Sequence, residues 1–296
     1  MPELPEVETI KRGLTKYVVG HTIQDVEIIN PGIIQGDIKN VVDQKIIGAR
    51  RVGKGLILDL SNNYSLGIHI KLTGQLIFRG KETDGLEVSK DKVGSVPNKF
   101  THVVFHLTKR SATDEVRQAS LYYNDQRRFG WIKIVKTTEL MTLPFFKNMG
   151  PEPFAKQNGS LQPNLDLETF SKIVKGKPTK IKPLLMDQEK IGGIGNIYAN
   201  DALFKAMINP ARPAKSLSDD EIKELFNAII AVMEKSFEEG GASELSFVNV
   251  LGQEGGYQRH ALVYGKTGKP CPRGDGTIER ITLAGRGTFF CKQCQA

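Results

Sequence analysis

The sequence predicts an α+β chain of two domains, with a leading helix and a β-sandwich or barrel first and a helical domain second. Between residues 24 and 135, short apolar runs alternate with polar residues and are separated by turn signals, which is typical of antiparallel strands. From about residue 138 apolar residues recur at helical spacing instead, and the longest such run covers residues 221–237. A chain of 296 residues is long enough to build two hydrophobic cores.

The first twenty residues predict the leading helix. Pro5 suits the first helical position, where a missing N–H costs nothing. Val7, Ile10 and Leu14 then recur at helical spacing, and Gly20 ends the run. Acidic residues at the start of this run suit the positive end of the helix dipole.

The remaining elements follow the same two patterns. Strands are expected around residues 24–28, 56–60, 66–70, 103–107 and 120–123, with an exposed loop over residues 80–98. Helices are expected around residues 167–174, 181–185, 197–204 and 221–237, and a hairpin over residues 277–290. Ser218, three residues before Glu221, has the spacing of a helix capping box.

These patterns give the expected domain boundaries. The β domain covers residues 1–135, and residues 136–153 form a linker that contains a Gly-Pro-Glu-Pro stretch. The helical domain covers residues 154–262, and the hairpin motif covers residues 263–296.

The composition restricts the class of protein. A net charge of +8 is consistent with a polyanionic partner. No apolar run approaches the roughly 20 residues of a membrane-spanning helix, and the first residues lack a secretory pattern. The three cysteines all follow residue 270, so they are not a disulfide framework, and we expect a cytoplasmic protein.

The N-terminus carries groups suited to covalent chemistry. Removal of the initiator Met leaves Pro2 with a free secondary amine, directly followed by the carboxylate of Glu3. An α-amino group has an ordinary pKa of about 7.7–8.0, so part of it is uncharged and nucleophilic near neutral pH. Its adduct with an aldehyde-level carbon is an iminium, which acts as an electron sink, and Glu3 is placed to move protons. The alternative is an acidic helix cap at a frayed terminus.

The stretch Met1-Pro2-Glu3-Leu4-Pro5-Glu6-Val7-Glu8-Thr9 resembles the start of bacterial formamidopyrimidine-DNA glycosylases, which remove 8-oxoguanine in base excision repair. The sister family, endonuclease VIII, usually has Gly where Leu4 stands. The resemblance continues block by block to the last cysteine. It implies an N-terminal β-sandwich with a leading helix, then a helix–two-turn–helix domain that ends in a zinc-finger-like β-hairpin.

The resemblance also assigns roles in the first domain. Lys54, in a basic run, matches a lysine that enters the active site, contacts phosphate and supports proton transfer. Leu72, Arg127 and Phe129 match three residues that fill the space left by an extruded base, although the family usually has Met at the first position. Such wedges offset the few kcal/mol that base flipping costs. Phe100 stands where the family commonly has a DNA-contacting His, so that contact is lost or shifts to His102.

In the second domain, the block Gly192-Gly193-Ile194-Gly195-Asn196 resembles the family's helix–two-turn–helix, with Asn196 on a DNA phosphate. Glycines allow close approach of a phosphate, and a helix start offers free N–H groups. Lys182 matches a lysine that reaches the lesion site. Lys266 and Arg286 match residues that hold phosphates, and Arg286 is linked to the second elimination. Taken singly, Lys266 and Arg286 also fit an ordinary basic turn, whereas the Gly192–Asn196 block is too specific for a plain helix–helix turn.

The resemblance suggests a pocket for the damaged base. Glu6, Ser243 and Tyr264 occupy matching blocks, and the glycine-rich loop over residues 250–260 would cover the base.

The cysteines leave one question open. The expected zinc pattern has four cysteines as two Cys-x2-Cys pairs, and here Cys271, Cys291 and Cys294 are present while Gly274 occupies the fourth position. Either zinc is bound with weakened affinity, with Asp275 or a water as fourth ligand, or the hairpin folds without metal.

Together these features predict a monomeric, bifunctional glycosylase and abasic-site lyase that acts on double-stranded DNA with oxidised purines or abasic sites. One alternative is the same chemistry with an endonuclease VIII-like preference for oxidised pyrimidines, against which Leu4 argues. Another is a DNA-binding paralogue without activity, which the incomplete cysteine pattern, Leu72 and Phe100 favour. Intact Pro2, Glu3 and Lys54 oppose it.

Overall fold

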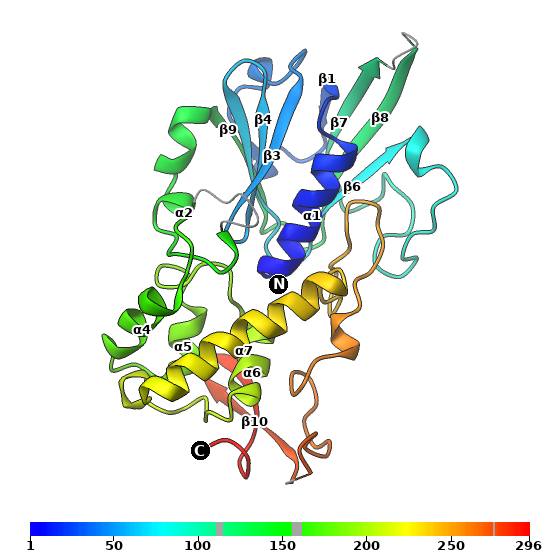
Figure 1. The fold of residues 1–296 in the computed structure, drawn as a ribbon. Helices are drawn as coiled ribbons and strands as arrows, with labels where there is room; N and C mark the ends of the chain where they lie inside the picture. Colours follow the sequence, from blue (N-terminus) through cyan, green and yellow to red (C-terminus); the bar gives the residue numbers. More distant parts are fainter. Residues whose placement is uncertain (111–114, 156–161, 275) are drawn as a thin grey trace. The chain divides into compact units, whose positions relative to one another are not determined.

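The computed structural model describes residues 1–110, 115–155, 162–274 and 276–296 of the chain (Figure 1). The chain forms two compact units. The first contains Met1–Lys147 and Glu239–Gly256, and the second contains Asn148–Glu238 and Tyr257–Ala296. The sequence patterns place residues 154–262 in one domain, whereas in the structure residues 239–256 belong to the first unit.

The first unit begins with helix α1 (Leu4–Tyr17) and contains two sheets. One sheet has the order β1 (Thr22–Ile28), β7 (Thr101–Arg110), β8 (Val116–Asp125), β6 (Gly74–Gly80). The other has the order β2 (Ile34–Gln35), β9 (Trp131–Lys136), β5 (Tyr64–His69), β4 (Gly55–Leu60), β3 (Ile46–Val52). All pairs are antiparallel except β2 with β9, which run parallel. The short helix α2 (Pro144–Lys147) ends the unit's first segment.

A shared core joins the two sheets and the leading helix. Val7, Ile10 and Leu14 of α1 are buried in the same apolar cluster as Leu58 of β4 and Phe105 of β7. Side chains from both sheets therefore meet in one layer, which is the arrangement of a β-sandwich. The leading helix follows the sequence prediction: Pro5 lies at its start, and the apolar face of α1 is fully buried. The predicted strand stretches fall on β1, β4, β5, β7 and β8.

The 81–98 segment, which follows β6, departs in part from the prediction of an exposed loop. Its backbone is irregular apart from a short 3-10 turn at Lys81–Thr83, as expected. However, Val93 is buried together with Ile77 of β6 and with Val248. The segment is therefore packed onto the first unit rather than free in solvent.

The second unit contains four helices among its described residues, namely α4 (Leu167–Lys175), α5 (Ile181–Met186), α6 (Asn196–Lys205) and α7 (Asp219–Glu238). The hairpin β10 (Ile278–Leu283) and β11 (Arg286–Cys291) follows. The predicted capping box is present: the Glu221 N–H donates to Ser218 Oγ at 3.2 Å, and the Ser218 N–H donates to Glu221 Oε2 at 2.8 Å. No helix in the described part of the chain is long and apolar enough to cross a membrane.

Candidate active site

The start of α1 is held from two sides. Glu3 is the residue before the first helical turn, and its N–H donates to Glu6 Oε2 at 2.7 Å. The other carboxylate oxygen of Glu6 accepts the N–H of Ala242 at 2.8 Å. Glu6 is almost fully buried, so both of its oxygens are used for positioning. Pro2, one residue earlier, therefore precedes a backbone of fixed conformation.

A buried ion pair joins α1 to the turn that carries Lys54. Arg51 Nε lies 3.1 Å from Glu8 Oε2, and both side chains are almost completely buried. Arg51 Nη1 also donates to the carbonyl of Gly53 at 2.8 Å. Lys54 follows Gly53 in the tight turn between β3 and β4, so its backbone is tied to the first turns of α1.

His69 lies at the end of β5, and the charge of Lys54 acts on it. Burial, followed by the positive charges of Lys71 and Lys54, lowers the pKa of His69 to about 3. His69 is therefore neutral at physiological pH, and its Nδ1 accepts the N–H of Lys71 at 2.8 Å. This bond holds the turn whose next residue is Leu72.

Asp125 organises the two loops that carry the predicted wedge residues. Its carboxylate accepts the hydroxyl of Thr73 and the N–H groups of Arg127, at 3.1 Å, and Gly130, at 2.8 Å. Asp125 is only 1% exposed, so these charge-assisted bonds are shielded from water. One carboxylate thereby fixes the turn after Leu72 and the loop that contains Phe129.

Two of the three predicted wedge residues, Arg127 and Phe129, are exposed. The Phe129 side chain is 55% exposed, which is unusual for a large aromatic ring. The Arg127 guanidinium lies 4.7 Å from the centre of this ring, within the range of a cation–π contact. Leu72 is partly buried, and its carbonyl accepts the hydroxyl of Ser246 at 3.0 Å.

The structure does not offer His102 as a replacement for the missing histidine at position 100. His102 is 3% exposed, and its Nε2 lies 2.7 Å from the carbonyl of Asp125. Phe100 is partly buried, with the Lys99 ammonium 5.1 Å from its ring centre. His102 thus supports the Asp125 loop from inside.

Two of the three predicted base-pocket residues belong to the first unit. Glu6 and Ser243 meet through the 239–256 loop, since the Glu6 carboxylate accepts the N–H of Ala242. Ser243 Oγ donates to the carbonyl of Phe247 at 2.8 Å and accepts the N–H of Gly255 at 2.9 Å. Both side chains therefore shape this loop, which includes part of the predicted 250–260 covering stretch. Tyr264 belongs to the second unit, and its place in a base pocket stays a prediction.

In the second unit, Gln188 holds the glycine-rich turn before α6. Its Nε2 donates to the Ile194 carbonyl at 2.7 Å, and its Oε1 accepts the N–H of Gly193 at 3.0 Å. Gly193 has φ +90°, a conformation that favours glycine. Asn196 is the first residue of α6, and Gly195 before it has no side chain to cap the helix. A phosphate contact by Asn196 stays a prediction.

Lys182 and Arg286 occupy contrasting environments. Lys182 is 1% exposed, and its Nζ donates to the Gly287 carbonyl at 2.9 Å and to Thr288 Oγ1 at 2.7 Å. In the structure this lysine braces strand β11, and a DNA contact by Lys182 stays a prediction. Arg286 begins β11 and is exposed at the hairpin turn, as a phosphate-binding finger residue requires.

Asp201 ties the segment around Tyr264 to α6. Its buried carboxylate accepts the N–H groups of Val263 at 3.0 Å and Tyr264 at 3.1 Å, and also the hydroxyl of Tyr257 at 3.0 Å. Lys266 follows, partly buried, and its ammonium donates to the Ala261 carbonyl. The predicted phosphate-binding turn is therefore held to the helical unit by one acid.

Three thiols converge in the hairpin motif. Cys271, Cys291 and Cys294 have sulfur atoms within 4.8 Å of one another, which makes them a possible metal-binding group among the described residues. Burial and the two neighbouring thiols raise the pKa of Cys294 to about 12. The Arg273 N–H also points to Cys271 Sγ, at 3.4 Å. Gly274 offers no ligand, and Asp275 lies outside the described residues.

The residues that sequence reasoning missed are mostly buried and charged or polar: Glu8, Arg51, His69, Asp125, Gln188 and Asp201. The available signal was the presence of acidic or basic residues inside apolar helix and strand patterns. Such residues are rarely buried unless they are paired.

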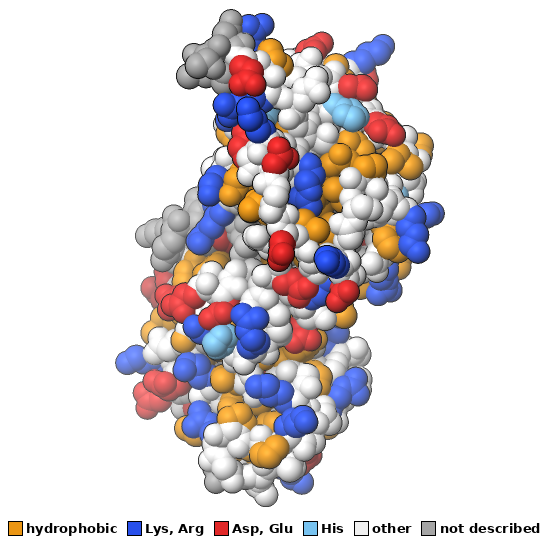
Figure 2. All heavy atoms as spheres, turned by 90° about the vertical axis from the view of Figure 1, so that its right-hand side faces the viewer, with side chains coloured by type: hydrophobic (Ala, Val, Ile, Leu, Met, Phe, Trp, Pro, Cys, Tyr) orange, Lys and Arg blue, Asp and Glu red, His pale blue; other side chains and the backbone are white. Residues whose placement is uncertain are grey.

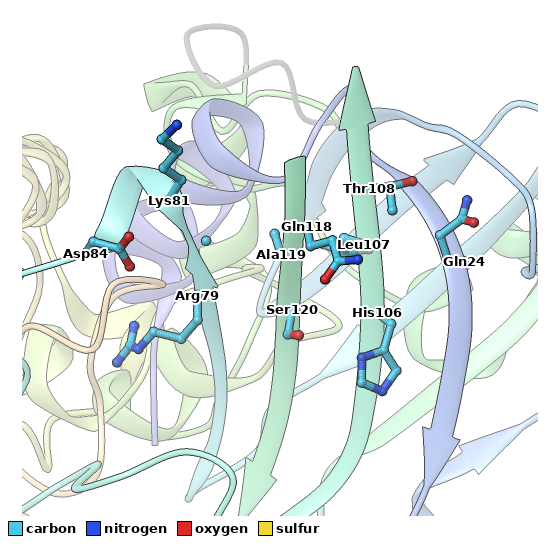
Figure 3. A pocket seen from close by; sticks show the side chains of 11 residues that line it. Gln24, Arg79, Lys81, Asp84, His106, Leu107, Thr108, Gln118, Ala119 and Ser120 are labelled. Carbon is cyan, nitrogen blue, oxygen red and sulfur yellow. The ribbon is translucent and has the colours of Figure 1, made fainter. Parts of the chain in front are cut away.

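A cavity of approximately 730 Å³ lies away from these residues, on one face of the four-stranded sheet (Figure 3). Polar side chains from β1, β7 and β8 line it, among them Gln24, Thr108, Gln118 and Ser120. Polar residues on one face of an antiparallel sheet are typical of its solvated side. Neither Pro2 nor Lys54 lines this cavity.

Basic side chains do not form a patch of their own on the face of the protein that Figure 2 shows. On the face shown in Figure 2, Lys and Arg side chains are interspersed with Asp and Glu. The net charge of +8 therefore does not appear there as a patch of one sign.

Comparison with known proteins decides the family. Residues 1–132 match the formamidopyrimidine-DNA glycosylase N-terminal domain, residues 149–247 its H2TH domain, and residues 268–296 the zinc finger found in FPG and IleRS. The chain belongs to the formamidopyrimidine-DNA glycosylase family.

Relatives and solved structures agree with this assignment. The chain is 39% identical to the formamidopyrimidine-DNA glycosylase of Lactiplantibacillus plantarum, over 98% of both chains. It is 37% identical to that of Enterococcus faecalis, over 100% of this chain and 97% of the relative. Crystal structures of the Lactococcus lactis enzyme with an N7-benzyl-Fapy-dG DNA and with an abasic-site DNA match with TM-scores of 0.81 and 0.82, at 30% identity and over 99% of both chains.

Proposed function

We propose that Pro2 is the nucleophile with which this DNA glycosylase excises oxidised purines from duplex DNA. The observation that carries the proposal is the fixed start of α1, where Glu6 holds Glu3 directly after Pro2. Removal of Met1 turns the Pro2 nitrogen into a free secondary amine. The family's relatives are glycosylases, and the Lactococcus lactis structures contain a Fapy-dG derivative and an abasic site.

The reaction follows from an amine that meets an aldehyde-level carbon. The Pro2 nitrogen forms a bond to C1′, and the damaged base departs with the electrons of the glycosidic bond and receives a proton. Loss of the nitrogen proton and opening of the sugar ring give an iminium. The iminium acidifies the C2′ hydrogen, so the 3′ phosphate leaves, and a second elimination releases the 5′ phosphate.

Glu3 and Lys54 assist this reaction. Glu3 moves a proton at the sugar, since it follows the nucleophile directly in the chain. Lys54 carries its charge in a turn that Arg51 ties to α1. A positive charge at this place suits a phosphate and a departing oxyanion.

The second unit and the wedge residues bind the DNA in this proposal. Phe129 and Arg127 enter the duplex beside Leu72, while Asn196, Lys266 and Arg286 hold phosphates. Lys182 supports the phosphate contact indirectly, because its ammonium holds strand β11, which carries Arg286. Phosphate contacts of this kind predict steep salt dependence of the affinity. We infer a monomeric, cytoplasmic enzyme, in keeping with three cysteines that all follow residue 270 and so are not spaced as a disulfide framework.

The cysteine group fits a structural zinc ion. Cys271, Cys291 and Cys294 would hold the ion, which would cross-link the ends of the hairpin. The hairpin keeps Arg286 at its exposed turn, and the metal takes no part in the chemical steps.

Borohydride trapping tests the proposal. The mature chain, with Met1 removed, should become covalently attached to an 8-oxoguanine duplex in the presence of borohydride. Pro2→Gly with Glu3→Gln should abolish trapping and strand cleavage, while Glu168→Gln, on the exposed surface of α4, should change neither. A mature chain that binds the duplex but never traps is a DNA-binding paralogue. Faster cleavage of thymine glycol than of 8-oxoguanine would show a pyrimidine preference instead.

A further inference from the structure

Lys92 of the 81–98 segment contacts both ends of the 239–256 loop. Its Nζ lies 2.9 Å from Glu254 Oε2, near the end of the loop, and donates to the carbonyl of Ser243, near its start. The Lys92 side chain is 18% exposed and the Glu254 side chain 39% exposed, so the contact is shielded mainly on the side of the lysine. The Lys92 ammonium therefore connects the start of the loop with its end.

Ser89 reinforces the same contact. Its hydroxyl donates to the other oxygen of Glu254 at 2.6 Å, and its N–H donates to the Gly252 carbonyl at 2.9 Å. Gly252 has φ +82°, and a Cβ there would come within 3.2 Å of Val88 in the 81–98 segment. Loop and segment thus follow each other closely, as the cyan and orange ribbons beside β6 show (Figure 1).

Apolar packing and one buried amide complete the contact. Val93 of the segment and Val248 of the loop are buried together against Ile77. Gln75 Nε2 donates to the Lys92 carbonyl at 3.0 Å and to the Ser246 carbonyl at 2.7 Å. The 81–98 segment and the loop are therefore attached to the same side chain of β6.

The loop in turn contacts the predicted wedge and the start of α1, both in the first unit. Ser246 Oγ donates to the carbonyl of Leu72, the predicted wedge, at 3.0 Å. At the other end of the loop, Ala242 donates to Glu6 at the start of α1. A change in the loop would therefore reach the base pocket and the wedge.

We propose that the 81–98 segment is a clasp that holds the 239–256 loop in its base-covering conformation, with Lys92 as the central positioning residue. The inference rests on the prediction that the glycine-rich stretch over residues 250–260, which begins in this loop, covers the damaged base. Lys92 does not touch the reacting atoms. It lowers the conformational freedom of the loop before the base arrives, which improves binding of the extruded base.

This role separates two reactions of the enzyme. Excision of 8-oxoguanine needs the base pocket, whereas cleavage at a preformed abasic site has no base to cover. Loss of the clasp should slow base excision much more than abasic-site cleavage. A merely structural role for Lys92 would lower both reactions together.

The experiment compares Lys92→Met with Lys92→Arg in the full chain. Lys172→Met, which removes an exposed ion pair with Glu168 on α4, is the matched control. Single-turnover excision of 8-oxoguanine, cleavage of an abasic duplex, and hydrogen exchange of peptides within residues 243–254 are measured. Lys92→Met should exchange faster and excise more slowly, each by about tenfold, because charge-assisted hydrogen bonds are lost. Lys92→Arg should recover most of both losses.

Three results would overturn the inference. Unchanged exchange in Lys92→Met would show that the loop does not depend on the clasp. Parallel loss of excision and abasic cleavage would assign Lys92 to general folding. Faster exchange with undiminished excision would show that the loop does not govern base binding. Failure of the Pro2 chemistry would be visible separately, as absent trapping by the unmodified chain, and the exchange measurement would still decide whether the clasp exists.

Discussion

Replacing Glu8 by Gln should destabilise the first unit more than any exposed charge removal. Glu8 and Arg51 form an ion pair at 3.1 Å, with their side chains 1% and 0% exposed. Removing one partner of a buried pair typically costs about 3–5 kcal/mol, because the remaining charge loses its counterion without regaining water. For a unit of this size, that corresponds to a fall in melting temperature of roughly 10 °C.

The assay can report on the first unit alone. Trp131, the single tryptophan of the chain, lies on β9 of this unit. Its fluorescence during thermal or urea unfolding therefore follows the unit that contains the ion pair. Glu115→Gln in the same unit, where Glu115 is 54% exposed and its partner Lys81 is 64% exposed, should change the transition by less than about 0.5 kcal/mol.

A double variant tests the reason for the loss. Glu8→Leu with Arg51→Met removes both charges, and its destabilisation should be much smaller than the sum of the two single changes. Additive losses, or a Glu8→Gln transition equal to that of Glu115→Gln, would refute the argument that the buried pair holds α1 against the Lys54 turn. The pair also positions Gly53, so abasic cleavage should slow in Glu8→Gln.

Two further predictions concern pH and metal. The pKa of His69 is lowered to about 3, so the folded unit resists protonation that the unfolded chain accepts below about 6.5. The free energy of unfolding should therefore fall by about 2 kcal/mol between pH 7 and pH 5. His69→Asn should reduce this pH dependence, measured by Trp131 fluorescence during unfolding. An equal pH dependence in both chains would contradict the prediction. Elemental analysis should find zinc bound to the purified chain and little in Cys291→Ser, whose hairpin should also exchange hydrogen faster; equal zinc in both chains would exclude these thiols as the ligands.

Local signals explain which elements the sequence could predict. The leading helix has Pro5 at its start and Gly20 just beyond its end, and the helix over residues 219–238 begins with the Ser218–Glu221 capping box. Each of these features is decided by neighbours within four residues. The alternating strands and the final hairpin were predicted for the same reason, since their patterns are continuous in the chain.

Contacts between distant segments explain what the sequence could not show. The 81–98 segment has the composition of an exposed loop, and only its contacts with residues 243–254 reveal that it is packed. Lys182 has the sequence context of a DNA contact, yet it is buried against strand β11. Asp125 follows an ordinary strand pattern, and its role depends on donors from two other places in the chain.

The two sequence interpretations of the N-terminus are compatible in the structure. Glu3 precedes the first helical turn, as a helix cap would, and this position holds the residue after Pro2 in place. The residue that links cap and chemistry is Glu6, whose two oxygens accept the N–H groups of Glu3 and Ala242. A carboxylate can accept both bonds, whereas an amide has one accepting oxygen and presents N–H groups on the other side.

Glu6→Gln should therefore break one of the two bonds and set an N–H against another N–H. The expected loss of stability is about 1–3 kcal/mol, with slower borohydride trapping on abasic DNA because the Pro2 nitrogen is less well positioned. Glu3→Gln, which leaves the backbone bonds of Glu3 in place, should retain the stability and lose proton transfer. Trapping by Glu6→Gln at the unmodified rate would show that the Pro2 nitrogen is positioned without Glu6, and that this carboxylate serves the 239–256 loop alone.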